Sequence, residues 1–155
     1  MTSIPTSKDF PDCFYRVSIK GLFVKDGKIL LLKESKKLSG QWELPGGGLD
    51  FGEDIYQALR REIGEETGLL VKHISEKPIY IWTRRSEHKR NMKWFYSLVL
   101  AYRIELENFE FKATDECEEL GFFSKEELHS IELNGHTNGL KNVFDPADFV
   151  SKEID

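Results

Sequence analysis

The chain of 155 residues has few cysteines, no long apolar run and no excess of positive charge. Each of these absences excludes a class of protein. Two cysteines, Cys13 and Cys117, are too few for a disulfide framework or a zinc site, so reduced thiols are expected. No apolar run reaches the roughly 20 residues that span a bilayer, and residues 1–12 lack the apolar core of a signal peptide. We therefore expect a cytoplasmic protein without a membrane partner.

The net charge of −5 and the pI near 5.5 show no surplus of lysine and arginine. Because nucleic-acid-binding domains carry a basic surface, we expect no nucleic-acid partner. The chain also shows no repeat, linker or low-complexity segment, and its length allows a real hydrophobic core. These features predict one domain over residues 1–155, with an irregular N-terminal segment at residues 1–12.

The hydrophobic pattern predicts strands interleaved with two main helices. Strands are expected at residues 14–24, 28–33, 42–44, 69–74, 79–83, 92–104 and 119–123. The two main helices are expected at residues 53–66 and, behind a capping box, at 124–130, and a short helix is expected near 140–144. Asp26 and Gly27 are typical of a hairpin turn, and residues 84–91 of a charged hairpin loop. Strands and helices in this order predict an α/β fold with a mixed β-sheet between helices.

Residues 53–66 form the most informative of these helices. They contain no proline, and Ile55, Leu59 and Ile63 recur at helical spacing. Glu53 falls in the expected first turn, where the helix dipole favours acids. Gly68 stands where a left-handed residue would end the helix.

Three glutamates of this helix, Glu62, Glu65 and Glu66, are spaced to share one face. A solvated acidic face is the usual meaning of such a cluster. Here no lysine or arginine follows four residues later, and only Arg61, four residues before Glu65, offsets the charge. Like charges at this spacing repel, and a bound Mg²⁺ or Mn²⁺ would remove the conflict. Because Mg²⁺ takes oxygen ligands and recruits phosphate oxygens, the pattern predicts metal-assisted work on phosphates.

The same residues match a known motif. The pattern G-x5-E-x7-R-E-U-x-E-E-x-G-U, with U an aliphatic residue, is the Nudix box, and residues 47–69 match it at every fixed position. On these residues the chain is identified as a member of the Nudix hydrolase family. The resemblance implies a Nudix-type α/β/α sandwich and metal-dependent hydrolysis of a nucleoside diphosphate linked to another group X. The partner would be a small nucleotide substrate. A homodimer is possible as well, since many members of the family dimerise.

The resemblance also assigns roles within the box. It makes Glu62 and Glu66 direct metal ligands, and Glu65 a ligand or a base acting through metal-bound water. Glu53 would bind the metal directly or through water. Arg61 is better placed to orient a box glutamate than to touch substrate, although a surface pair with Glu65 is the alternative.

The glycines before the helix have a separate role. Gly46 and Gly47 would let the backbone approach the helix and the substrate phosphates closely. For Gly48, which the pattern does not fix, a plain turn explains the residue equally well.

Candidates outside the box depend on looser matches. Glu116 is the best match for a general base and Glu118 the second, with a solvated acidic loop as the alternative. Arg84 leads a local basic cluster and is the first candidate to meet substrate phosphate, although a solvated loop is the commoner meaning. His136 lacks ligand spacing and is interpreted as structural.

We favour a nucleoside triphosphate as substrate, because one compact domain leaves little extra surface for a large X group. A nucleotide-sugar or dinucleoside-polyphosphate hydrolase is the alternative among enzymes. A non-catalytic Nudix-fold nucleotide-binding module is the alternative from another class, and the intact box glutamates argue against it.

Overall fold

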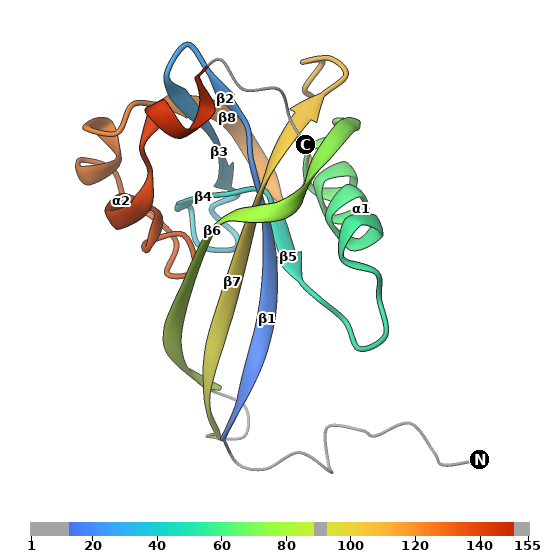
Figure 1. Cartoon of the computed structure of the whole chain (residues 1–155), viewed down its shortest axis with the longest axis vertical. Coiled ribbons are helices and arrows are strands. Elements are labelled where there is room, and N and C mark those ends of the chain that lie inside the picture. Colours follow the sequence, from blue (N-terminus) through green and yellow to red (C-terminus); the bar gives the residue numbers. More distant parts are fainter. Residues whose placement is uncertain (1–12, 89–92, 151–155) are drawn as a thin grey trace.

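The computed structural model describes residues 13–88 and 93–150, and its strands lie between α1 on one side and short C-terminal helices on the other (Figure 1). The strands are β1 (Cys13–Leu22), β2 (Val24–Lys25), β3 (Lys28–Glu34), β4 (Trp42–Glu43), β5 (Gly46–Gly48), β6 (Val71–His88), β7 (Lys93–Leu106) and β8 (Cys117–Phe123). The helices are α1 (Ile55–Thr67), η2 (Glu127–His129), α2 (Leu140–Val143) and η3 (Pro146–Phe149).

The strands form two sheets. The first has the order β5-β1-β7-β6, in which β1 runs parallel to β7 and the other pairs are antiparallel. In the second, β2, β4 and β8 all pair with β3 antiparallel. The prediction of an α/β/α sandwich with a mixed sheet is confirmed, and the structure adds that the strands divide between two sheets.

Two apolar clusters hold the layers together. The cluster under α1 joins the helix to β1, β6 and β7 through Ile19, Ala58, Leu59, Ile63, Leu69, Val71, Ile74, Tyr102 and Ile104. The cluster under the C-terminal helices contains Leu22, Ile29, Leu31, Leu44, Ala101, Leu128, Leu133, Leu140, Phe144 and Phe149. Alternate residues of β1 therefore serve opposite layers, and the face away from α1 carries the apolar Leu22 as well as the polar Ser18 and Lys20.

Helix α1 agrees with the sequence except at its start. It begins at Ile55 because the Asp54 side chain accepts a hydrogen bond from the Gln57 backbone N–H and caps the helix. Glu53 therefore precedes the helix, and its expected place in the first turn was wrong. Gly68 ends the helix at φ +73°, as expected, and its N–H donates to the Gly64 carbonyl.

The expected strands at residues 69–74 and 79–83 are parts of one strand, β6, which continues through most of the expected charged loop to His88. Its pairing with β7 shifts register on both sides of Pro78. Ser75 bridges the irregularity, because its hydroxyl donates to the Lys77 carbonyl and accepts the Arg103 N–H. The strand lies at the sheet edge, where proline is tolerated.

The expected helix at residues 124–130 is only a 3₁₀ turn, η2. The capping box itself is present, since Ser124 and Glu127 exchange side-chain-to-backbone hydrogen bonds of 3.1 Å. The chain then turns to place Leu133 beside Trp42 in a parallel bridge. This tertiary pairing overrides further helix growth. The expected segment at residues 1–12 and the rest of the expected loop, residues 89–91, lie outside the described residues.

Candidate active site

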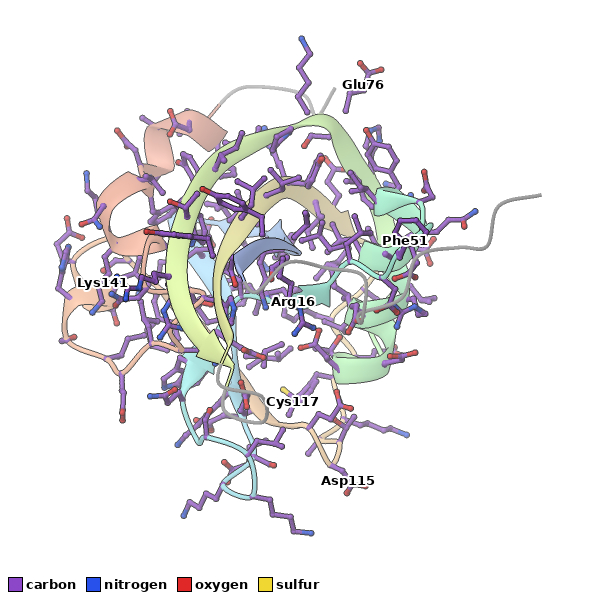
Figure 2. The ribbon with its side chains drawn as sticks, turned by 90° about the horizontal axis from the view of Figure 1, so that it is seen from below. Arg16, Phe51, Glu76, Asp115, Cys117 and Lys141 are labelled. Atoms are coloured by element: carbon purple, nitrogen blue, oxygen red, sulfur yellow. The ribbon has the colours of Figure 1, made fainter. Side chains whose placement is uncertain are left out.

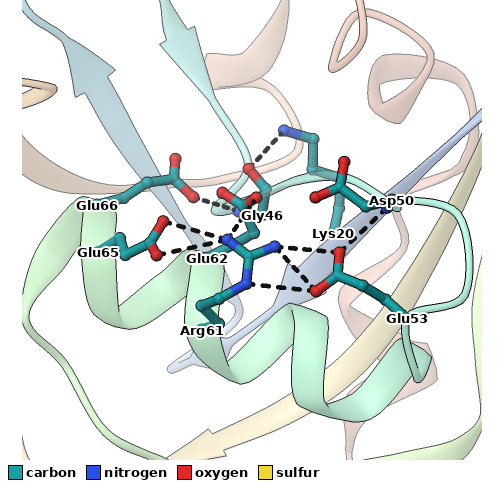
Figure 3. A network of polar contacts seen from close by, with 8 residues as sticks. All are labelled: Lys20, Gly46, Asp50, Glu53, Arg61, Glu62, Glu65 and Glu66. Atoms are coloured by element: carbon teal, nitrogen blue, oxygen red, sulfur yellow. Dashed lines mark hydrogen bonds and ion pairs between the residues drawn. The ribbon is translucent and has the colours of Figure 1, made fainter.

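Gly46 of β5 fixes the geometry of the site. Its backbone has φ +131°, and a Cβ there would collide with the carbonyl oxygen of Ile19 on β1. Only glycine suits both conditions. The N–H of Gly46 donates to Oε1 of Glu66 at 2.9 Å, so β5 and the end of α1 are joined by one charged hydrogen bond (Figure 3).

Glu66 is a buried carboxylate with 6% of its surface exposed. Burial raises its pKa to about 8, while the charge of Lys20 and the Gly46 N–H act in the opposite direction. Lys20 is itself buried, and its Nζ donates to the carbonyl oxygens of Leu44 at 3.2 Å and Gly46 at 3.3 Å. A buried carboxyl group with a raised pKa is stabilised in its ionised form when a cation binds beside it.

Glu62 lies against Gly47, one residue farther along β5. A Cβ on Gly47 would come within 2.7 Å of the Glu62 carboxyl carbon. Burial raises the pKa of Glu62, the positive charge of Arg61 lowers it and the negative charge of Glu65 raises it. Gly47 therefore provides the space that the Glu62 carboxylate occupies.

Arg61 links three box glutamates. Its Nη2 donates to both carboxylate oxygens of Glu53 at 3.1 Å, and its Nη1 lies 3.2 Å from Glu65 Oε2 and 3.3 Å from Glu62 Oε1 (Figure 3). Arg61 and Glu65 are exposed and Glu53 and Glu62 are half-buried, so solvent screens the pairs and each adds little stability. The fork geometry instead restricts where the carboxylates point, and the surface pair with Glu65 exists as well.

The three helix glutamates do not present one uniform acidic face. Glu66 turns inward to Gly46, Glu62 is half-buried, and Glu65 is exposed and turned toward Arg61. Among residues 13–88 and 93–150, no three acidic, histidine or cysteine side chains converge on one point. Glu62 and Glu66 nevertheless lie against adjacent glycines of β5, so the three carboxylates of the expected face differ in exposure and in their partners.

Glu116 stands in the loop before β8, close to the end of α1. The Thr114 hydroxyl donates to the Glu66 carbonyl oxygen and accepts the N–H of Glu116, which fixes the loop beside the helix. The charge of Glu116 contributes to the raised pKa of Glu66. Glu118 is exposed on β8.

Two charged residues at this site escaped the sequence analysis. Burial raises the pKa of Glu43 on β4 to about 8, the charge of Lys20 opposes the shift, and a hydrogen bond with Glu34 reinforces it. Lys20 lies opposite Gly46 in the β1–β5 pairing. Its signal in the sequence is the alternation on β1, where Ser18 and Lys20 interrupt a run of apolar residues.

Arg84 lies on β6 rather than in a hairpin loop. Its guanidinium packs against Gly135, where no side chain intervenes. It borders a cavity of about 310 Å³, which is lined by Trp82, Thr83, Arg84, Leu133, Asn138 and Asn142 among others. Its expected contact with substrate phosphate stays a prediction.

A family model described as the NUDIX domain matches residues 15–145. The chain belongs to the NUDIX family. The predictions of the family, the fold and a hydrolase are confirmed. Within the described residues, none of the NUDIX chain's helices is long and apolar enough to cross a lipid bilayer.

Two of the curated NUDIX relatives are named for different substrates. The chain is 34% identical over 116 residues to an ADP-ribose pyrophosphatase of Methanocaldococcus jannaschii, a match that covers 74% of this chain and 65% of that protein. It is 31% identical over 140 residues to the nucleoside triphosphatase NudI of Salmonella paratyphi B, covering 83% of this chain and 97% of that protein.

Solved NUDIX structures share the fold. A MutT NUDIX hydrolase from Burkholderia pseudomallei has a TM-score of 0.59 and 25% identity, covering 83% of this chain and 96% of that one. The E. coli ORF135 protein has a TM-score of 0.66 and 24% identity, covering 93% and 97%.

Proposed function

We propose that this NUDIX protein uses Mg²⁺ to hydrolyse the pyrophosphate linkage of a nucleoside diphosphate linked to another group X. The substrate that we favour is a nucleoside triphosphate. The observation that carries the proposal is the buried Glu66 carboxylate, held on the β5 backbone beside Glu62 and bordered by the Glu116 loop. The substrate is a free nucleotide, and we place the activity in the cytoplasm.

The residues present fit a divalent metal. Glu66 and Glu62 are carboxylates whose pKa values are raised, first of all by burial. Hard oxygen donors of this kind suit Mg²⁺, and Mn²⁺ is an acceptable substitute. Glu62 and Glu66 would hold the metal, with Glu65 and Glu53 as further ligands. The bound metal would neutralise phosphate charge and assist the ionisation of the attacking water.

The chain's own groups have separate tasks in the proposed reaction. Arg61 keeps Glu53 and Glu65 in place through its forked contacts. Gly46 leaves room for the β1 backbone and Gly47 for the Glu62 carboxylate, so β5 lies close to the proposed metal ligands, and substrate phosphates would approach its backbone there. Glu116, positioned by Thr114, accepts the proton of the water that attacks phosphorus.

The relatives support a nucleotide substrate without choosing among nucleotides. The match to the nucleoside triphosphatase NudI spans 97% of that protein, whereas the match to the ADP-ribose pyrophosphatase spans 65%. We therefore keep the nucleoside triphosphate as first choice. The deciding experiment incubates the protein and Mg²⁺ with nucleoside triphosphates, ADP-ribose, nucleotide sugars and dinucleoside polyphosphates, and identifies the products by mass spectrometry. Turnover of ADP-ribose alone would reject the triphosphate, and binding without turnover of any compound would reject the enzyme.

Glu116→Gln is expected to lower kcat by at least about tenfold with little change in KM, since a base acts mainly in the transition state. The matched control is Glu118→Gln, which removes an exposed carboxylate from the adjoining strand and should change kcat by less than about threefold, within roughly 0.7 kcal/mol. Steady-state kinetics on both variants decide the matter. Loss in Glu118→Gln alone would reassign the base, and no loss in either would make the segment a solvated loop.

A further inference from the structure

A row of polar residues crosses the first sheet on the face away from α1. Arg16 of β1 pairs with Ser97 of β7, and Ser97 pairs with Arg84 of β6. Directly paired residues point to the same face of a sheet. The next residue on β1, Val17, packs in the cluster under α1, so Arg16 and its row lie on the opposite face.

Each arginine of the row lies on a glycine. A Cβ on Gly48 would come within 2.6 Å of Nη2 of Arg16, and a Cβ on Gly135 would collide with the guanidinium of Arg84. Gly48 belongs to β5, directly beside Gly46 and Gly47 of the candidate metal site. The structure thus gives Gly48 a reason beyond a turn: it leaves space for Arg16 next to the place where the phosphates are expected.

His136 connects the two ends of the row. Its Nε2 lies 2.9 Å from the hydroxyl of Ser97, which is fully buried. Burial, together with the charges of Lys20, Arg84 and Arg16, lowers the pKa of His136 to about 4. The three positive charges therefore favour the neutral form of the His136 imidazole.

Within the described part of the chain, neither guanidinium group forms an ion pair with an acidic side chain. Among the residues that the structure describes, the ion pairs within 4.0 Å involve Lys28 and Arg61 but neither Arg16 nor Arg84. The chain has 27 acidic residues against 22 lysines and arginines, so acidic side chains are not scarce. Neighbouring cations that form no ion pairs attract an anionic ligand. Figure 2 shows Arg16 near the middle of the view, within the curve of β6 and β7.

We propose that Arg16 and Arg84, with Ser97 and His136 between them, form an anion-binding row that takes the phosphate chain of the substrate beyond the scissile linkage. The inference depends on the proposed function and sharpens its substrate class. Guanidinium groups bind phosphate through forked, charge-assisted hydrogen bonds. A triphosphate offers a further charged phosphate to this row, whereas a nucleotide sugar offers neutral hydroxyls. The row therefore selects nucleoside triphosphates over nucleotide sugars and ADP-ribose.

Binding of inorganic tripolyphosphate tests the row without relying on turnover. In EDTA, calorimetry should show binding to the wild type that weakens about tenfold or more in Arg16→Gln and in Arg84→Gln. Arg85→Gln is the matched control, because its side chain leaves β6 on the opposite face. Glu66→Gln should still bind tripolyphosphate, so loss of catalysis and loss of the row are distinguishable. Absent binding to the wild type, or equal affinities in all these variants, would overturn the proposal.

The imidazole supplies a second readout that reports where the anion lies. Tripolyphosphate would offset the charges of Arg16, Arg84 and Lys20 around His136. The other close partners of His136 are uncharged: the Ser97 hydroxyl, the Asn134 side chain, which accepts its backbone N–H, and the Trp82 indole, which donates to its carbonyl oxygen. An NMR titration, assigned with His136→Gln, should show the pKa of His136 rising when tripolyphosphate is added. An unchanged His136 pKa would place the anion elsewhere and contradict the row.

Selectivity between substrates completes the test. In Mg²⁺, Arg16→Gln and Arg84→Gln should each lower kcat/KM for nucleoside triphosphates about tenfold or more, and change that for ADP-ribose by less than about threefold. Circular dichroism and the thermal midpoint serve as folding checks. Equal losses on both substrates would show that the row does not select triphosphates.

Discussion

Glu66→Gln is expected to lower kcat by at least about two orders of magnitude while the protein stays folded. The amide keeps the size of the side chain, and its carbonyl oxygen still accepts the Gly46 N–H. What it removes is the negative charge of a buried carboxylate, the charge that would hold a divalent metal beside Glu62. The loss should therefore appear in catalysis and not in folding.

The stability of this variant gives an independent check. Because burial raises the pKa of the wild-type carboxyl group, an uncharged amide avoids the cost of burying a charge when no metal is bound. Denaturant unfolding in EDTA should show equal or higher stability than the wild type. Glu107→Gln, at an exposed position outside the site, is the matched control for loss of one carboxylate. Near-wild-type kcat in Glu66→Gln would remove the residue from the mechanism.

Gly46→Ala is expected to destabilise the protein by about 3 kcal/mol or more, the largest effect on folding that we predict. The backbone at Gly46 has φ +131°, and a methyl group would collide with the Ile19 carbonyl oxygen. That obstacle is main chain of the neighbouring strand β1, so it cannot rotate away. Relief would require β5 to separate from β1, which also breaks the contact with Glu66.

Gly64→Ala is the matched control for this glycine substitution. Gly64 lies inside α1, and a Cβ there meets no atom within 4 Å. Alanine should stabilise the helix by up to about 1 kcal/mol. The two variants are compared by their midpoints of urea unfolding, provided that the dependence of the unfolding free energy on urea concentration is unchanged. Opposite signs support the strained geometry of β5, whereas a Gly46→Ala protein as stable as the wild type would show that β5 adapts freely.

The local part of the site was predictable from sequence. The spacing of Glu62, Glu65 and Glu66, the terminal Gly68 and the paired Asp26 and Gly27 all describe neighbours along one stretch of chain. Helical periodicity and turn chemistry act over such short distances, so they can be read without a fold. The α1 helix and the hairpin turn were found on this basis.

The rest of the site is non-local. Arg16, Ser97 and Arg84 come together only through the register of three strands, two of which run parallel, and no local pattern sets that register. The burial of Glu43 and Lys20 beside the site is set by the packed fold, although the alternation on β1 hints at an unusual place for Lys20. The expected helix after Ser124 was shortened by a similar effect, since pairing of Leu133 with Trp42 outweighs helix propensity.

The central claim is that Glu62 and Glu66 hold the divalent metal that the reaction requires. Electron paramagnetic resonance of free Mn²⁺, titrated with protein, measures this binding directly, with and without a non-hydrolysable nucleoside triphosphate. We predict that Glu62→Gln and Glu66→Gln each weaken Mn²⁺ binding at least about tenfold, while Glu107→Gln binds as the wild type does. Equal Mn²⁺ affinity in the wild type and in both box variants would contradict the account.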